Sequence, residues 1–465
     1  MQRNQSLDAL RGFAILAMVL SSSIAFGILP GWMYHAQEPP PGHLFNPGLP
    51  GITWVDLVFP FFLFSMGAAF PLAFHKRIQS GEPTWKLIYH ITQRYILLVF
   101  FAIFTLHARA RIISAAPGLE EQFLSIACFI LLFFMYYEWE KEKSSRMIWG
   151  IKSLSFLMAI TFLFVMPFAD GKGVSLHHSD IIIIVLANMA FFGSLIWLGT
   201  RNYPVLRIAL LPFVMAIILA SDTEGSWNKI LFDWSPFDWM YQFYYLKYLF
   251  IILPATFAGE WLLSLKEEKL QVEGNGKKSS GATAFVCITL ILLNVLFLYL
   301  RLILFNLFIT AIIIVLLFFL LKRNASNHVS GCHKRLAMAG SYLLLLGLFF
   351  EAFEGGVKKD PSTYSYYFIT GGLAFVALLA FEFLERSGYG KTVRQFLVST
   401  GKNPMVAYVT GNLLLLPLLN ITGAIQIFNL MGSNVWAGIL RGFLFTGIVA
   451  LITIGFVKKK WYWKT

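Results

Sequence analysis

Long apolar runs separated by short polar stretches repeat along nearly the whole chain. Each run is near twenty residues, the length that an α-helix needs to cross about 30 Å of hydrocarbon. The runs lie near 8–29, 52–74, 87–106, 121–138, 147–168, 180–199, 205–221, 246–265, 282–300, 302–321, 336–354, 364–384, 404–420 and 436–457. This is an upper count, because 282–321 could be one hairpin or a bent helix. The pattern predicts an all-α, polytopic transmembrane helix bundle of about 10–14 spans.

Composition agrees with this class, since 57% of the 465 residues are hydrophobic and 13% are charged. The net charge of +13 would suggest nucleic acid in a soluble chain. In a membrane protein the positive-inside rule explains it better, so no nucleic-acid partner is expected. A cytoplasmic N-terminus puts most Lys and Arg residues on cytoplasmic loops, including the 75–86 loop and the C-terminal tail. The far side then receives 30–51, 107–120, 169–179, 222–245, 355–363 and 421–435.

The chain is expected to form one integral-membrane domain over 1–465. A charged, Gly/Ser-rich stretch, LKEEKLQVEGNGKKSS at 266–281, predicts a mobile cytoplasmic linker. None of the three cysteines has metal-ligand spacing, and no metal site is predicted. Walker A, Rossmann and HExxH motifs are absent from the sequence, which argues against ATP-driven transport and zinc hydrolysis by those routes.

A polar loop between the first two apolar runs carries the first candidate chemistry. It contains His35 and His43, and Asp56 follows as the next helix begins. Histidine titrates near neutral pH and can act as base, acid or nucleophile. Thr53 and Asp56 have capping-box spacing, with Asp in place of Glu. An aspartate near a loop histidine could also fix its tautomer.

Other polar residues near the span ends could form the wall of a site on the far side. Arg109 and Arg111 stand out on a face otherwise poor in positive charge, and Glu351 precedes the segment KKDPSTYSYY, which contains Lys359. We expect His43, Arg109, Glu351 and Lys359 to be substrate-binding residues. The alternative is that such side chains reach toward the interface and are inert. Three prolines, 39–41, favour an extended, stiff segment in the first far-side loop.

Several motifs resemble the bacterial relatives of heparan-α-glucosaminide N-acetyltransferase, within the wider transmembrane acyltransferases. These are SLDALRGFAILAMVL, the loop histidine in YHA, and GITWVDLVFPFFLFSMGAAFPL. The pieces KKDPSTYSYYFITGGLAFVALL and GKNPMVAYVTGNLL are similar to later segments of that family. The likeness is strongest over 6–74 and 358–412.

The resemblance implies transfer of an acetyl group from cytoplasmic acetyl-CoA to an amino sugar or related glycan on the other side. It places the family's catalytic histidine on His35 and its helix-start aspartate on Asp56. Two departures matter. The family's asparagine in the first helix falls on Ser22, and the loop after His35 carries the insertion EPPPGHLFNPGLP with His43.

An anionic donor on the cytoplasmic side would need cations at the inner face. Candidates for binding acetyl-CoA are Arg11, Arg94, Lys402 and Asn403, with Lys86 and Arg394 as further cations. Positive-inside bias alone would also put cations there. Asn403 could bond the cofactor or only cap its helix.

Competing interpretations remain open from the sequence. A secondary transporter or flippase for a glycan or lipid-linked sugar would show similar spans and a similar polar cluster, and a non-catalytic membrane partner is a third possibility. For the enzyme, a ternary complex and a ping-pong route are not separated. The expected partners are the acyl donor, the sugar acceptor and membrane lipid, with a homodimer as an open option. The expected location is the bacterial inner membrane.

Overall fold

The computed structural model describes residues 4–139, 145–267, 274–323 and 331–465. Within these residues, thirteen helical segments are long and apolar enough to cross a membrane. Twelve of them are α1 (Gln5–Ser23), α2 (Trp54–Gln79), α3 (Thr84–His107), α5 (Leu119–Tyr136), α6 (Ser145–Val165), α7 (Ile181–Thr200), α10 (Leu249–Glu267), α11 (Gly274–Tyr299), α12 (Ile303–Arg323), α13 (Gly331–Phe353), α14 (Tyr364–Ser387) and α19 (Val435–Lys458).

The remaining membrane-length segment is interrupted. It runs through α16 (Pro404–Thr410), a π-helical turn (Gly411–Leu415) and α17 (Leu416–Ile421). An apolar helix of 16 residues, α8 (Pro204–Leu219), falls short of full membrane length. Short helices complete the chain: η1 (Gly31–Met33), α4 (Ala110–Ile113), α9 (Trp227–Asp233), η2 (Phe243–Tyr248), α15 (Lys391–Gly401), α18 (Ile425–Leu430) and η4 (Met431–Ser433). The prediction of an all-helical polytopic bundle is therefore confirmed.

The region 282–321 forms two separate helices, α11 and α12, that pack against each other. The predicted linker 266–281 is wrong at its ends, because α10 continues to Glu267 and α11 begins at Gly274. Its central residues, 268–273, lie outside the described residues. Lysine, glutamate and glycine near the helix ends did not prevent helix formation here, where each segment continues a long apolar helix.

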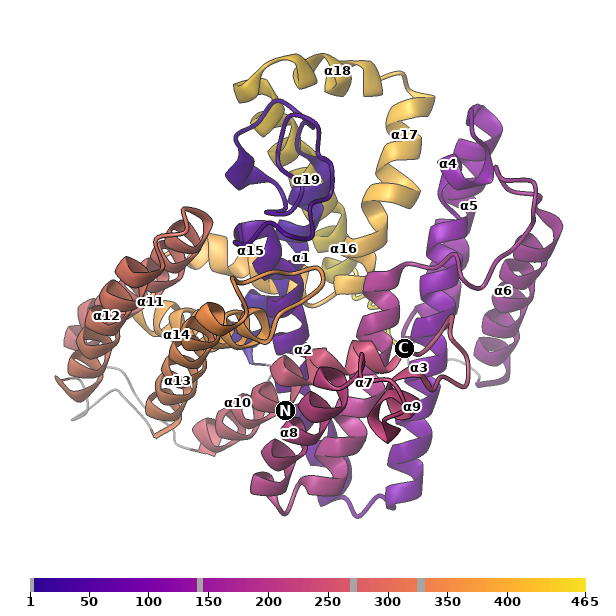
Figure 1. The fold of residues 1–465 in the computed structure, drawn as a ribbon. Coiled ribbons are helices and arrows are strands. Elements are labelled where there is room, and N and C mark those ends of the chain that lie inside the picture. Colours follow the sequence, from indigo (N-terminus) through magenta and orange to yellow (C-terminus); the bar gives the residue numbers. More distant parts are fainter. Residues whose placement is uncertain (1–3, 140–144, 268–273, 324–330) are drawn as a thin grey trace.

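Helix α14 forms the centre of the bundle, since 89% of its apolar stretch of 18 residues is buried. It packs against α13, α11, α1, α10 and α2. In Figure 1, α11–α13 lie on one side of the molecule and α5 and α6 on the other, with α1 and α2 between them. The peripheral helices α6 and α12 bury only 17% and 28% of their apolar stretches. Their remaining apolar surfaces suit contact with lipid.

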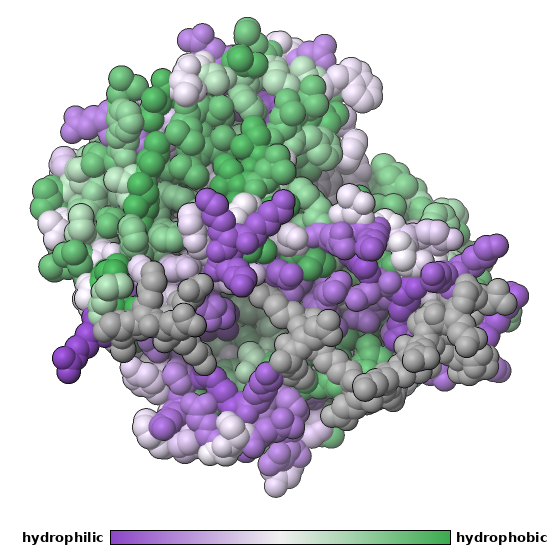
Figure 2. Space-filling model, turned by 180° about the vertical axis from the view of Figure 1, so that it is seen from behind, coloured by the Kyte–Doolittle hydropathy of each residue, from purple (hydrophilic) through white to green (hydrophobic). Residues whose placement is uncertain are grey.

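Hydrophobic and hydrophilic surfaces are segregated on the outside of the molecule. Figure 2 shows a face whose upper part is hydrophobic, while hydrophilic residues gather across its lower part. This division is the one that a bilayer imposes, with apolar side chains against lipid and polar ones against water. The protein is an integral membrane protein by this architecture, and the side of the membrane that each end faces stays a prediction.

Helices α1 and α15 approach each other through two glycines. A Cβ on Gly12 would lie 1.9 Å from the Leu397 carbonyl oxygen, and a Cβ on Gly401 would lie 1.9 Å from that of Asp8. No side chain fits at either position. The contact holds the amphipathic α15 against the first helix of the bundle and sets where α16 begins.

Candidate active site

The loop between α1 and α2 folds back on itself before it reaches His35. The Tyr34 hydroxyl donates to the Ala25 carbonyl oxygen at 2.7 Å and accepts from the Leu29 amide at 2.9 Å. The Thr53 hydroxyl donates to the Tyr34 carbonyl oxygen at 2.7 Å. These bonds join both ends of the loop, so His35 is presented at the start of α2 rather than out in solvent.

Asp56 caps α2, as its spacing from Thr53 predicted. Its Oδ2 accepts from the Thr53 amide at 2.9 Å and from the Ala36 amide at 3.3 Å. Its Oδ1 is buried and has no hydrogen-bond partner among the described residues. Oδ2 therefore serves the helix cap, and Oδ1 is available to interact with other groups.

His35 lies between two carboxylates. Its Nε2 is 3.5 Å from Asp56 Oδ1 and 3.6 Å from Asp360 Oδ2. Its Nδ1 accepts a hydrogen bond from the Gln37 amide at 3.0 Å. Because Nδ1 is an acceptor, the neutral ring carries its proton on Nε2, toward the carboxylates. The structure thus brings the two predicted catalytic residues together and adds a third, Asp360.

The buried Gln37 side chain joins this loop to a loop more than three hundred residues away. Its Nε2 donates to the Asp360 carbonyl oxygen at 2.5 Å, and its Oε1 accepts from the Asp360 amide at 2.8 Å. A further bond runs from the Gly51 amide to the Val357 carbonyl oxygen at 2.8 Å. The loop 354–363 is thereby fixed against the loop between α1 and α2.

The charges around His35 partly balance one another. The Lys359 ammonium lies 3.8 Å from Asp56 Oδ1. The His35 ring, and then the Lys359 charge, hold the pKa of Asp360 below its usual range despite partial burial. Asp56 is fully buried and Asp360 is half-exposed, so Asp360 lies on the open side of the cluster. Predicted Lys359 therefore belongs to the site.

His43 does not lie between the carboxylates. Its ring stacks on Phe26 with centroids 3.8 Å apart, and its Nδ1 lies 3.0 Å from the Glu38 carbonyl oxygen. The expected extended proline segment is wrong, because the Pro39 carbonyl oxygen accepts from the His43 amide at 3.1 Å and closes a turn. This local bond and the stacking on Phe26 give the insertion a turn in place of an extended segment.

Arg109 belongs to a second polar cluster. Its Nη2 is 2.8 Å from Asp180 Oδ2, and the Tyr408 hydroxyl donates to the same oxygen at 2.8 Å. A cavity of about 410 Å³ lies beside this cluster and is also lined by Ser22 and Asn412. Ser22 therefore lines the same cavity as Arg109 and Asp180.

Glu351 is neither in this cavity nor beside His35. It is buried and pairs with Arg301, which binds it to the loop between α11 and α12. This ion pair joins the end of α13 to the loop between α11 and α12, and the Glu351 carbonyl oxygen also accepts from the Gly356 amide at 2.9 Å, at the start of the loop that carries Lys359.

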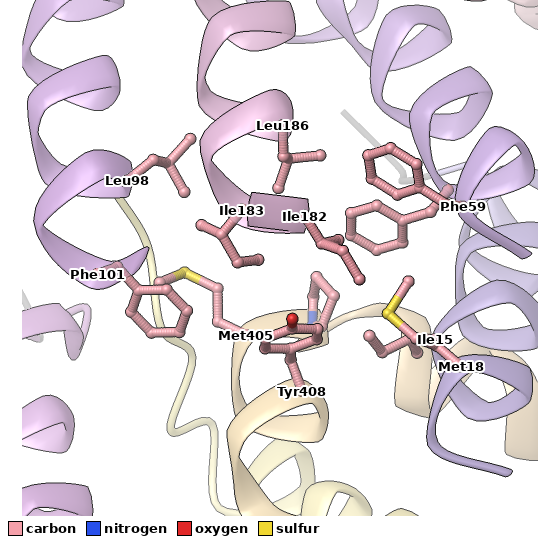
Figure 3. A pocket seen from close by; sticks show the side chains of 12 residues that line it. Ile15, Met18, Phe59, Leu98, Phe101, Ile182, Ile183, Leu186, Met405 and Tyr408 are labelled. Carbon is pink, nitrogen blue, oxygen red and sulfur yellow. The ribbon is translucent and has the colours of Figure 1, made fainter. Parts of the chain in front are cut away.

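Next to this polar cavity lies an apolar cavity of about 40 Å³, shown in Figure 3. Its walls come from α1, α2, α3, α7 and α16, with Phe59, Phe101, Met405 and Tyr408 among the side chains. Met18, Ile182 and Tyr408 also line the larger polar cavity. We call this apolar cavity the neck.

Arg11 and Arg94 lie one helical turn from the neck, toward the end of the bundle that is predicted to be cytoplasmic. Arg11 precedes the neck residue Ile15 by four positions, and Arg94 precedes the neck residue Leu98 by four. Arg11 contacts Asp8 at 3.3 Å, and the two arginines are close enough for their charges to interact. The Nε of Arg94 is buried without a hydrogen-bond partner among the described residues.

Asn403 has a structural role in this geometry. Its Nδ2 donates to the Trp461 carbonyl oxygen at 2.8 Å, and its Oδ1 accepts from the Trp463 amide at 3.2 Å. The side chain holds the C-terminal tail against α16. Neighbouring Lys402 is half-buried and caps α15.

The residues that sequence reasoning did not select are Gln37, Asp360, Asp180 and Tyr408. Asp360 and Tyr408 lie within segments that the resemblance singled out, so a signal existed for both. Gln37 and Asp180 carried none, because a lone polar residue in a loop has no local pattern. Their roles depend on partners far away in the sequence.

These features define a polytopic helical membrane protein with a buried His–carboxylate cluster where its interhelical loops meet. A family model described as "Domain of unknown function (DUF5009)" matches residues 3–262, and the chain belongs to that family. No curated protein matches the chain. The matched region contains His35 and Asp56 but ends before Lys359 and Asp360.

Proposed function

We propose that this protein is a transmembrane acetyltransferase of the bacterial inner membrane. It would move an acetyl group from cytoplasmic acetyl-CoA to an amino sugar, or a related glycan, on the periplasmic side. The observation that carries the proposal is the position of His35 Nε2, 3.5 Å from Asp56 and 3.6 Å from Asp360. The resemblance of the 6–74 and 358–412 segments to transmembrane acyltransferases points to the same chemistry.

In the proposed reaction the acceptor amine attacks the thioester carbonyl carbon. A C–N bond forms, the C–S bond breaks, and CoA leaves as its thiol after taking up a proton. Because Nδ1 of His35 already accepts from Gln37, the exchange takes place at Nε2, which passes its own proton to Asp56 Oδ1 and takes up the proton lost by the amine. Asp56 Oδ1, buried and without a hydrogen bond, stabilises that proton.

The route for the donor follows the neck. Arg11 and Arg94 offer two cationic groups on the inner side, suited to the phosphates of acetyl-CoA. On the outer side, neck residue Phe59 lies three positions after Asp56 on α2, hence on the same helix face. A neck of about 40 Å³ must widen for the pantetheine arm, so donor binding is expected to move α16 or its neighbours.

Direct transfer fits the resting geometry better than an acetyl-histidine intermediate. Nε2 bears the proton and faces two carboxylates across gaps of about 3.5 Å, which leave no room for a thioester between them. An attack by Nε2 would first need loss of its proton and displacement of Asp360. We therefore favour a ternary complex.

Two purified variants test the proposal. General-base removal typically costs about 10²–10⁴-fold in rate, so His35→Ala should lose that much acetyl transfer from radiolabelled acetyl-CoA to glucosamine while acetyl-CoA binding is kept. His43→Ala should cost far less, since its ring packs on Phe26. An inactive His43→Ala beside an active His35→Ala would overturn the assignment. Counterflow of unmodified sugar without covalent acetylation would identify a carrier instead.

A further inference from the structure

An apolar groove runs along the side of the bundle between α8, α10, α13 and α14. In Figure 1, α10 lies between α8 and α13. The groove has a volume of about 460 Å³, and its lining includes Leu211, Met215, Phe250, Phe257, Leu346 and Phe368. Pro212 and Pro254 line it from inside α8 and α10. Each proline removes a backbone hydrogen bond and favours a bend, which helps hold the helices apart.

The length of the groove matches one leaflet of a bilayer. Along α10 its wall extends from Phe250 to Trp261. At 1.5 Å per residue this is about 16 Å, roughly half of the 30 Å hydrocarbon thickness. The Phe250 end lies directly after η2, on the side of the loop 354–363. The groove therefore runs from the level of the candidate active site toward the middle of the membrane.

A short chain of contacts joins the outer end of the groove to the loop that carries Asp360. The Tyr364 hydroxyl donates to the carbonyl oxygen of groove residue Met215 at 3.4 Å. The Lys247 ammonium lies 5.8 Å from the centre of the Tyr364 ring and donates to the Ser362 carbonyl oxygen at 3.0 Å. Ser362 is two residues from Asp360. A molecule in the groove would thus place its polar end near this loop.

Cations gather where that polar end would lie. Lys247 is half-buried beside the groove, and Lys358 and Lys359 are on the adjoining loop. The Glu354 carboxylate attracts the Lys247 charge, but it also accepts hydrogen bonds from the Tyr364 and Ser365 amides at 2.7 Å. Two of the lone pairs of Glu354 are therefore already used, and Lys247 has two N–H groups beyond its bond to Ser362. An anionic group such as a phosphate diester suits this position.

We propose that the acceptor is a lipid-linked amino sugar whose hydrocarbon chain occupies this groove. Its phosphate would lie near Lys247, and its sugar amine would reach the cluster of His35, Asp56 and Asp360. This inference rests on the proposed acetyl transfer and names the class of its acceptor. Binding energy from the remote chain would then assist transfer at the sugar.

The test compares two acceptors with the same head, methyl-phospho-glucosamine and dodecyl-phospho-glucosamine, with the full-length protein in nanodiscs. The dodecyl compound should show a kcat/KM higher by about tenfold or more. Leu346→Trp fills the groove and should remove most of this preference while leaving the methyl acceptor unchanged, which also shows that the variant folds. Phe349→Trp is the matched control, because Phe349 is 67% exposed and does not line the groove. It should keep the preference.

Equal kcat/KM for the two acceptors, or the same loss for both in Leu346→Trp, would overturn the proposal. A second measurement separates it from the acetyl transfer itself. Diazirine-bearing dodecyl-phospho-glucosamine should label α8 or α13 in His35→Ala, and Leu346→Trp introduced into that background should abolish the labelling. Equal labelling by a diazirine-bearing dodecyl phosphocholine would mean that the groove holds ordinary membrane lipid, and would also overturn the proposal. If labelling is specific but acetylation is absent, the groove stands and the acetyltransferase proposal fails.

Discussion

Replacing Asp56 by Asn separates the two roles of this carboxylate. The helix cap uses Oδ2, which accepts from Thr53 and Ala36, and an amide oxygen can accept the same bonds. The amide NH₂ then takes the place of Oδ1, opposite the His35 Nε2–H and the Lys359 ammonium. The amide NH₂, the His35 Nε2–H and the Lys359 ammonium, all hydrogen-bond donors, would then face one another without the carboxylate oxygen Oδ1 between them. Asp56→Asn should keep the fold and lose activity.

The size of the loss follows from the distance. A proton held near Nε2 lies 3.5 Å from Asp56 Oδ1. With an effective dielectric constant near 20, one negative charge at that distance is worth about 5 kcal/mol. That corresponds to roughly 10³–10⁴ in rate, and Lys359 and Asp360 reduce it by acting on the same proton. We therefore expect a loss of about 10²–10³-fold, milder than for His35→Ala.

The assay is acetyl transfer from radiolabelled acetyl-CoA by purified protein in nanodiscs, with thermal denaturation measured on the same samples. Asp56→Ala is the control for the cap, because it removes the acceptor for Thr53 and Ala36 and should lower the unfolding temperature. If the activity of Asp56→Asn stays within a factor of about two of that of the parent protein, the reasoning is refuted and Asp56 is a capping residue only.

Three further expectations concern other parts of the molecule. The pKa of Asp360 is lowered in the folded protein, so its ionised carboxylate should stabilise the fold above about pH 4, and this stabilisation should disappear as the pH falls through the lower folded pKa. When unfolding temperature is measured against pH, the difference between the parent protein and Asp360→Asn should vanish over that range. Asn403→Leu strips hydrogen bonds from the backbone of Trp461 and Trp463, which should cost about 2–4 kcal/mol in denaturation without changing the KM for acetyl-CoA. Lys464→Cys should react with an impermeant maleimide only after permeabilisation, and labelling in intact cells would reverse the predicted orientation.

Apolar periodicity was enough to predict the bundle, because length and hydropathy alone determine which segments can cross a membrane. Each of the fourteen predicted runs overlaps a helix, although α8 is short and α16–α17 contains a π-helical turn. The amphipathic α15 escaped prediction. It carries no apolar run of membrane length, and its place beside α1 depends on backbone contact at Gly12 and Gly401.

The candidate site was only half predictable. His35 and Asp56 stand close in sequence, and the helix cap gives Asp56 a local signature. The side-chain amide of Gln37 bonds the backbone of Asp360, and no local sequence pattern predicts this pairing. The positions of His43 and Glu351 were not predictable either, because stacking on Phe26 places His43 and a tertiary ion pair with Arg301 places Glu351; their substrate-binding roles stay predictions.

The pairing of Gln37 with Asp360 also determines when the cluster can form during biosynthesis. These residues are 323 positions apart, and a chain elongates at about 5–20 residues per second, so roughly 15 s to 1 min separates their synthesis. Throughout that interval the first two helices are made while the loop that completes their cluster does not yet exist. The nascent protein thus passes through the translocation machinery with Asp56 unaccompanied by Asp360 and Lys359. The candidate active site is assembled late, after the loop before α14 has been synthesised.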